Sequence, residues 1–251
     1  MYIMFSESHC HLGSITADKI DEAKKNGFTL LLTSGIDLKS SIEAADTASR
    51  YDIVKGSVGV HPWYADEYND DVGKRFREIA KNPEVVAISE IGLDYIGRMT
   101  KEWVREEEYI DKDIQMETLS KQLKLARDLE YPAIVHDRSE GMDLLELLLD
   151  TRNTESGLAI HGFSKDAEYA EKAFENGIYL SVGLRTLQNG DQNFLEAISI
   201  TPIEYLLTET DSGDPHGVLE VCSRIAKIKD LTRDEVGRIT TENLMKLCKI
   251  S

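Results

Sequence analysis

The chain is poor in cysteine and has no long apolar run. Its three cysteines are an odd number in 251 residues and form no CxxC pair, which predicts reduced thiols in a cytoplasmic protein. No stretch approaches the ~18 apolar residues of a membrane span. The first residues also lack the basic region and the apolar length of a signal peptide. We therefore expect a cytoplasmic protein with no membrane partner.

Basic residues are too few to balance the acidic ones. There are 29 Lys and Arg against 46 Asp and Glu, which gives a formal net charge of −17. A chain this acidic repels polyanions at long range and lacks the basic footprint that is typical of nucleic-acid-binding domains. A phosphate substrate would therefore need local positive charge, and metal ions are one way to supply it.

What the sequence does contain is a regular alternation of β-rich runs and helical patterns. The β-rich runs cover residues 2–7, 28–35, 53–62, 85–94, 131–138, 157–164, 177–183 and 203–212. Several are almost continuously apolar, as expected for parallel strands that are buried on both faces. Eight strands alternating with helices predict an α/β fold of the (β/α)8 TIM-type barrel class, with a doubly wound open sheet as the alternative.

Helical patterns fill the intervals and extend past the last strand. They cover residues 16–26, 39–51, 71–82, 113–130, 139–151, 165–176 and 191–200, followed by 216–229 and 232–249. The last of them opens with Thr232 and Glu235, the spacing of a capping box. No linker-like stretch interrupts the pattern, so we expect a single domain over residues 1–251. The polar segment 96–113 is interpreted as an excursion of the fourth βα loop.

The histidines and two acids fall at the predicted carboxyl ends of strands. These residues are His9, His11, His61, Glu90, His136, His161, Asp211 and His216. In a barrel those ends form the face that carries the active site. A single histidine there is usually an ordinary loop residue, but a ring of imidazoles and carboxylates on one rim is what a divalent metal site requires.

The number of candidate ligands favours two metal ions. The candidates are His9, His11, Glu90, His136, His161 and Asp211. That is more than one tetrahedral ion needs, and a shared carboxylate can hold two ions close together. Glu90 lies inside an apolar strand, where an ionised carboxylate is costly unless it is neutralised. Strand alternation places Glu209 and Asp211 on the same face, so spacing alone leaves both open as the acid of strand eight.

The ordered motifs "SHCHL", "GVHPW", "SEIGLDY", "AIVHDR", "AIHGFS" and "TETDS" resemble the TatD family of metal-dependent deoxyribonucleases, within the amidohydrolase superfamily. The resemblance extends from about residue 6 to the end of the chain. It implies a distorted barrel with two divalent ions, such as zinc, magnesium or manganese. On this resemblance His9, His11 and Asp211 hold one ion, His136 and His161 hold the other, and Glu90 bridges them.

The resemblance also implies substrate contacts and a function. His61 would contact a substrate phosphate, as would Arg138 unless it is instead an ion-pair partner of an acid at the rim. The implied activity is that of a phosphodiesterase with 3′-exonuclease-like action on DNA ends or short oligonucleotides. Two metal ions would activate a water for attack on phosphorus, with Asp211 as the general base. The alternative is an amidohydrolase that cleaves a small amide, ester or lactone at the same centre.

The chain departs from the family pattern at two places. Glu7 stands where the family usually has aspartate, and we expect it to support the site without binding a metal. After Asp211 the chain enters a helix almost at once, so a phosphate-contacting loop is expected to be missing. His216 lies in this shortened loop, either as a substrate contact or as a surface residue.

Overall fold

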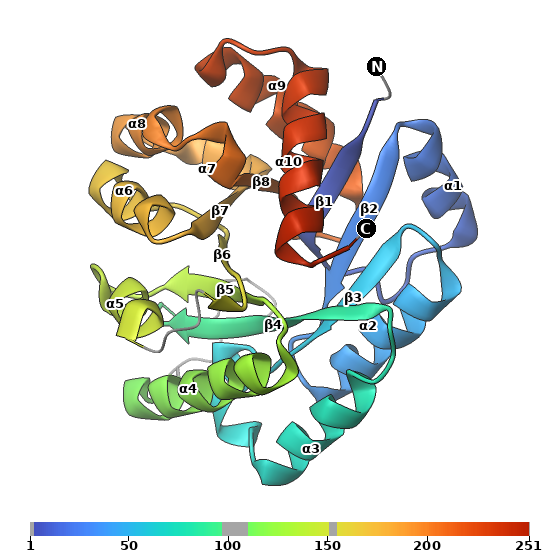
Figure 1. Cartoon of the computed structure of the whole chain (residues 1–251), viewed down its shortest axis with the longest axis vertical. Coiled ribbons are helices and arrows are strands. Elements are labelled where there is room, and N and C mark those ends of the chain that lie inside the picture. The colour runs from blue at the N-terminus through green and yellow to red at the C-terminus, as the bar shows by residue number, and fades with distance from the viewer. Residues whose placement is uncertain (1–2, 97–109, 151–154, 251) are drawn as a thin grey trace.

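A computed structural model describes residues 3–96, 110–150 and 155–250. Eight parallel strands lie side by side in sequence order (Figure 1). They are β1 (Phe5–Cys10), β2 (Phe28–Ser34), β3 (Val54–Val58), β4 (Val85–Asp94), β5 (Ala133–Arg138), β6 (Leu158–His161), β7 (Ile178–Gly183) and β8 (Leu206–Glu209). A doubly wound sheet reverses its strand order at a switch point. The unbroken order excludes that alternative and confirms the predicted (β/α)8 barrel.

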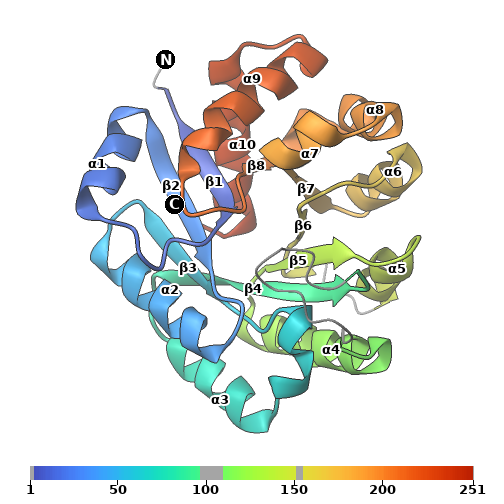
Figure 2. The same ribbon diagram turned by 180° about the vertical axis from the view of Figure 1, so that it is seen from behind.

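Helices cover the outside of the strands in both views of the molecule (Figure 1, Figure 2). They are α1 (Ala17–Lys25), α2 (Leu38–Arg50), α3 (Asp70–Ile79), α4 (Lys112–Leu129), α5 (Asp143–Asp150), α6 (Ala167–Glu175), α7 (Leu184–Asn189), α8 (Gln192–Ile200), α9 (Val218–Lys229) and α10 (Arg233–Leu247). Short 3₁₀ turns are η1 (Pro62–Glu67), η3 (Ile203–Tyr205) and η4 (Pro215–Gly217). In the part of the chain that the structure describes, no helix combines the length and apolar character needed to cross a bilayer.

The predicted elements match the observed ones, apart from a few boundaries. The strands expected over 53–62 and 203–212 are shorter, because η1 begins at Pro62 and η3 precedes β8. Helix α7 was not predicted, because it follows β7 with no intervening loop and is only six residues long. Most of the expected excursion over 96–113 lies outside the described residues.

The barrel closes where the first strand meets the last. The hydroxyl of Ser8 donates to the carbonyl of Thr208 (3.0 Å), and the hydroxyl of Thr208 donates to the carbonyl of Ser6 (3.0 Å). Just above, the backbone N–H of Asp211 donates to the carbonyl of His9 (3.1 Å). These bonds fix the carboxyl ends of β1 and β8 beside each other.

Helix α10 packs across the closing strands on the outside of the barrel (Figure 1). Its predicted capping box is confirmed, because Thr232 and Glu235 each accept the backbone N–H of the other. Gly237 lies against Phe5 of β1, and a β-carbon at this position would come within 2.4 Å of the Phe5 ring. The lack of a side chain at Gly237 therefore lets the helix approach the strand.

Candidate metal centre

The candidate ligands lie on or just after five strands, toward the carboxyl ends of those strands. His9 belongs to β1 and Glu90 to β4, while Asp211 follows the end of β8 by two residues. His136 and His161 are paired residues in the parallel register of β5 and β6, so their side chains leave the sheet next to each other. All of these side chains except that of Asp211 are buried.

Three of the donor atoms form a compact triangle. The Nδ1 atom of His136 and the Nε2 atom of His161 are 3.2 Å apart. They lie 3.1 and 2.9 Å from the Oε1 atom of Glu90. The centre of such a triangle lies ~2 Å from each of the three atoms, the distance at which nitrogen and oxygen ligands bind zinc. These three side chains could therefore hold one divalent ion.

A second set of donor atoms surrounds the other oxygen of Glu90. Its Oε2 atom lies 3.3 Å from Nε2 of His9 and 3.6 Å from Nε2 of His11. The Oδ1 atom of Asp211 lies 3.7 and 3.2 Å from the same two nitrogens. A regular tetrahedron with ligands ~2 Å from its centre has edges of about 3.3 Å. This set could hold a second ion, with Glu90 shared between the two.

The hydrogen-bonding state of the imidazoles fits a bound cation. The Nδ1 atom of His11 donates to the carbonyl of Ser34 (3.1 Å), which makes Nε2 the ring nitrogen that faces the carboxylates. The Nε2 atom of His9 is buried and has no hydrogen-bond partner among the residues that the structure describes. Buried polar atoms are normally paired, so an unpaired nitrogen facing two carboxylates is what a metal ligand would look like.

The two carboxylates of the centre are held in their charged form. Burial opposes the ionisation of Glu90, but the surrounding His61, His161 and His9 keep its pKa well below the usual range. Burial also disfavours charge on Asp211, and the hydrogen bond from His11 outweighs it and lowers the pKa of Asp211 to about 2. Both groups are therefore anionic at neutral pH, as cation ligands must be.

His61 lies beside this centre as a hydrogen-bond donor. Its Nδ1 atom accepts the backbone N–H of Trp63 (3.1 Å), which places the ring proton on Nε2, 3.3 Å from Oε1 of Glu90. Burial lowers the pKa of His61 to about 4, so the ring is neutral. A neutral ring with Nε2 protonated can donate to an oxygen but has no free lone pair at that atom for a metal.

Sequence reasoning missed Asp94 at the end of β4. Its Oδ2 atom accepts hydrogen bonds from Nε2 of His136 (3.1 Å) and Nε1 of Trp63 (2.9 Å). The bond to His136 fixes the proton on Nε2 and leaves Nδ1 for the centre, as carboxylates behind metal-bound histidines do. Asp94 comes four residues after Glu90 on the same strand, so alternation along that strand was the available signal.

Arg138 also contacts Asp94, which supports the ion-pair alternative for this residue. Its Nη1 atom lies 3.7 Å from Oδ2 of Asp94, and about a third of its side chain is exposed. The same residue lines a cavity beside the centre. Arg138 is therefore close enough to form an ion pair with the buried Asp94. The rest of its guanidinium faces the cavity.

Two further acids, Glu7 and Glu209, accept hydrogen bonds from the backbone beside the candidate ligands. The Oε1 atom of Glu7 accepts the backbone N–H groups of His9 (3.2 Å) and Thr210 (2.9 Å). Burial raises the pKa of Glu7 well above its ordinary value. The carboxylate of Glu209 accepts from the backbone N–H of Gly162 (2.6 Å) and the hydroxyl of Ser181 (2.5 Å). Both acids contact the chain next to a candidate ligand.

The two ring nitrogens of His216 have partners away from the candidate metal centre. Its Nδ1 atom lies 2.7 Å from Oδ1 of Asp214, and its Nε2 atom lies 3.2 Å from the side-chain nitrogen of Asn26. Its ring packs edge-on against Phe28 at the start of β2. His216 belongs to η4, and these contacts hold its side chain against the turn between α1 and β2. They favour the surface-residue interpretation over a substrate contact.

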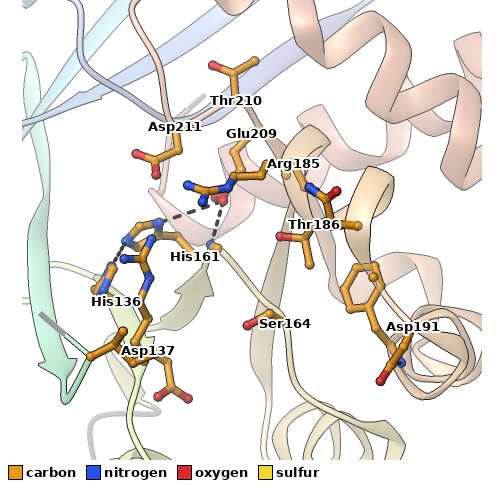
Figure 3. Close-up of a pocket in the computed structure, with 17 residues that line it drawn as sticks. His136, Asp137, His161, Ser164, Arg185, Thr186, Asp191, Glu209, Thr210 and Asp211 are labelled. Atoms are coloured by element: carbon orange, nitrogen blue, oxygen red, sulfur yellow. Dashed lines mark hydrogen bonds and ion pairs between the residues drawn. The ribbon is translucent and has the colours of Figure 1, made fainter. Parts of the chain in front are cut away.

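A cavity of about 710 Å³ opens beside the centre. His136, His161 and Asp211 line one end, while Arg185 and Thr186 line it from α7 (Figure 3). Sequence reasoning gave no role to Arg185, because the residue belongs to the helix that was not predicted. The cavity is large enough for a small ligand whose reacting group faces the histidines.

Residues 7–249 match the profile of a family described as "TatD related DNase". A Bacillus subtilis protein, "Uncharacterized metal-dependent hydrolase YabD", is 28% identical over 99% of this chain and 100% of its own length. The "3'-5' ssDNA/RNA exonuclease TatD" of Cronobacter turicensis is 30% identical over 78% of this chain and 71% of its own length. A crystal structure of the TatD homologue YJJV from Escherichia coli has a TM-score of 0.84 at 22% identity, covers both chains fully, and shows the same fold.

Proposed function

Because the chain belongs to the TatD family of metal-dependent hydrolases, we propose that it is a phosphodiesterase that removes nucleotides from the 3′ end of DNA or short oligonucleotides. The observation that carries this proposal is the pair of donor sets that share Glu90, each oxygen facing one set. Two-ion centres of this kind suit displacement at phosphorus. The name of the Cronobacter relative gives the substrate class.

The proposed ligands divide between the two ions. His9, His11 and Asp211 would hold one ion, His136 and His161 would hold the other, and Glu90 would bridge them. Bound there, divalent ions such as zinc, magnesium or manganese supply Lewis-acid activation of water and electrostatic stabilisation of the anionic transition state.

The protein's own groups would supply the remaining steps. Asp211 is ionised, and nearly half of its side chain is exposed, so it can accept the proton of the attacking water. The Nε2–H group of His61 would donate to a phosphoryl oxygen. The part of Arg138 that faces the cavity would add a second donor.

The net charge of −17 is compatible with a substrate that is a DNA end or a short oligonucleotide. Long duplex DNA is held through many phosphate contacts with Lys and Arg. In this chain the 29 Lys and Arg are outnumbered by 46 Asp and Glu, whose charges repel such a polyanion. A frayed 3′ end that enters a cavity needs only the few cationic groups around the reacting phosphate.

A paired assay tests the proposal. The metal-free protein is loaded with manganese, magnesium or zinc and given a 5′-labelled single-stranded oligonucleotide and, separately, a panel of uncharged esters, lactones and amides. We expect a metal-dependent ladder of products shortened from the 3′ end, and we expect His161→Asn to abolish it. Failure to shorten DNA with all three metals, together with turnover of the esters or lactones, would overturn the proposal in favour of the amidohydrolase alternative.

A further inference from the structure

Arg185 is a cation at the edge of the candidate metal centre. It is exposed, lies on α7 and lines the cavity. In Figure 3 its side chain extends from α7 toward the end of the cavity that holds Asp211 and His161. Within the described residues it forms no ion pair and no side-chain hydrogen bond. Five guanidinium N–H groups are therefore available to a ligand.

Nearby acids do not account for this arginine, because each already has partners. Asp137 accepts from the hydroxyl of Tyr169 (2.6 Å). Asp191 accepts the backbone N–H of Phe194 (3.0 Å) as the N-cap of α8. Glu209 accepts from Gly162 and Ser181, and Asp211 contacts His11. The guanidinium of Arg185 is thus placed among acids that are satisfied without it.

Among the residues that the structure describes, two arginines bring positive charge to the cavity. These lining residues include Arg138 and Arg185 and no lysine. Arg138 shares its charge with the buried Asp94 at 3.7 Å. The segment between Asp211 and α9, residues 212–217, contains no Lys or Arg. In the described part of the chain, an anionic group of a substrate that enters here therefore meets the guanidinium of Arg185, which has no ion-pair partner there.

We propose that Arg185 binds a phosphate group of the substrate beside the metal centre and so selects phosphate esters over uncharged esters. A planar guanidinium pairs with two phosphate oxygens through parallel N–H···O bonds. Its position on α7 places it in the lining of the same cavity as His136 and His161. The inference rests on the proposed phosphodiesterase function, whose substrate it specifies.

Phosphate binding and turnover test the role of Arg185 separately. Manganese-loaded protein is titrated with thymidine 5′-monophosphate and with inorganic phosphate, using the wild type, Arg185→Gln and Arg185→Lys. Arg75→Gln, which removes an exposed arginine of the outer helix α3, is the control for net charge. We expect Arg185→Gln to weaken binding of both ligands by about tenfold to a hundredfold. Arg185→Lys should lose less, and Arg75→Gln should bind as the wild type does.

Turnover should separate affinity from chemistry. For bis(p-nitrophenyl) phosphate, Arg185→Gln should raise KM more than it lowers kcat, whereas hydrolysis of p-nitrophenyl acetate should not change. Equal phosphate affinity in the wild type and Arg185→Gln overturns the inference, even if the wild type cleaves phosphodiesters. An absence of phosphate binding to the wild type overturns it as well. Failure of the broader function has its own readout, which is the lack of phosphodiester cleavage by the wild type.

Discussion

At the scale of single residues, the centre depends on how one carboxylate is shared. The Oε1 atom of Glu90 lies within 3.3 Å of nitrogens of His61, His136 and His161, and its Oε2 atom faces His9 and His11. Burying an anion is costly unless positive charge or hydrogen bonds surround it. The imidazoles supply that environment in the protein alone, and cations would supply more of it.

Removing the Glu90 carboxylate should therefore change metal stoichiometry. We expect Glu90→Ala to bind fewer ions per chain than the wild type, because both donor sets lose an oxygen. Elemental analysis after dialysis against a metal buffer measures the content directly. Glu117→Ala, which removes an exposed acid of α4, is the control and should keep the wild-type content. Equal metal content in Glu90→Ala and the wild type would contradict the bridging role.

At the scale of elements, the contact between α10 and β1 depends on a missing side chain. Alanine is normally the better helix former than glycine by about 1 kcal/mol. At Gly237 the added methyl group would meet the Phe5 ring at 2.4 Å and the Met4 carbonyl at 2.7 Å. The steric cost should exceed the gain in helix propensity, because neither the ring nor the backbone can easily move.

We expect Gly237→Ala to lower the free energy of unfolding by about 1–3 kcal/mol. Urea denaturation followed by circular dichroism measures it. Gly73→Ala in α3 is a matched control, because its methyl group meets only the end of the Tyr68 side chain, at 3.0 Å. That variant should be as stable as the wild type or more so. A stabilised Gly237→Ala protein would show that α10 does not pack tightly on β1.

Sequence patterns predicted the elements and the strand-end positions of the candidate ligands because both follow local rules. Buried parallel strands are continuously apolar, and their carboxyl ends converge wherever the barrel closes, so His136 and His161 could be placed without coordinates. The contact of Asp94 with His136 and the place of Arg185 in the cavity were missed because they depend on how elements meet in space. Asp94 meets His136 across two strands, and Arg185 enters the cavity from a helix with no sequence signature.

At the scale of the whole molecule, the reactivity of the three buried cysteines indicates whether the protein is folded. Cys10 lies in β1, Cys222 in α9 and Cys248 just after α10, and all three are free and buried. Burial raises the pKa of Cys222 and of Cys248 to about 12, and it raises that of Cys10 well above the ordinary value. The reactive thiolate is therefore scarce at every one of these positions.

A thiol reagent at pH 8 should thus react with the native protein about a thousandfold more slowly than with the unfolded chain, whose thiols have pKa values near ~8.5. Absorbance of the released thiolate of Ellman's reagent, with and without urea, gives the two rates. All three thiols should become reactive over the same range of urea concentration. Rapid labelling of one thiol under native conditions would instead indicate local opening of the element that contains it.

The meeting of β1 and β8 has a consequence for how the protein comes into being. His11 and Asp211 touch across 200 positions of the chain. A ribosome that synthesises this protein releases His9 and His11 early, and their partner emerges only when most of the polypeptide has been made. The donor set of His9, His11 and Asp211 can therefore form only after β1 and β8 have come together. An ion bound to this set would stabilise their contact and so the closed barrel.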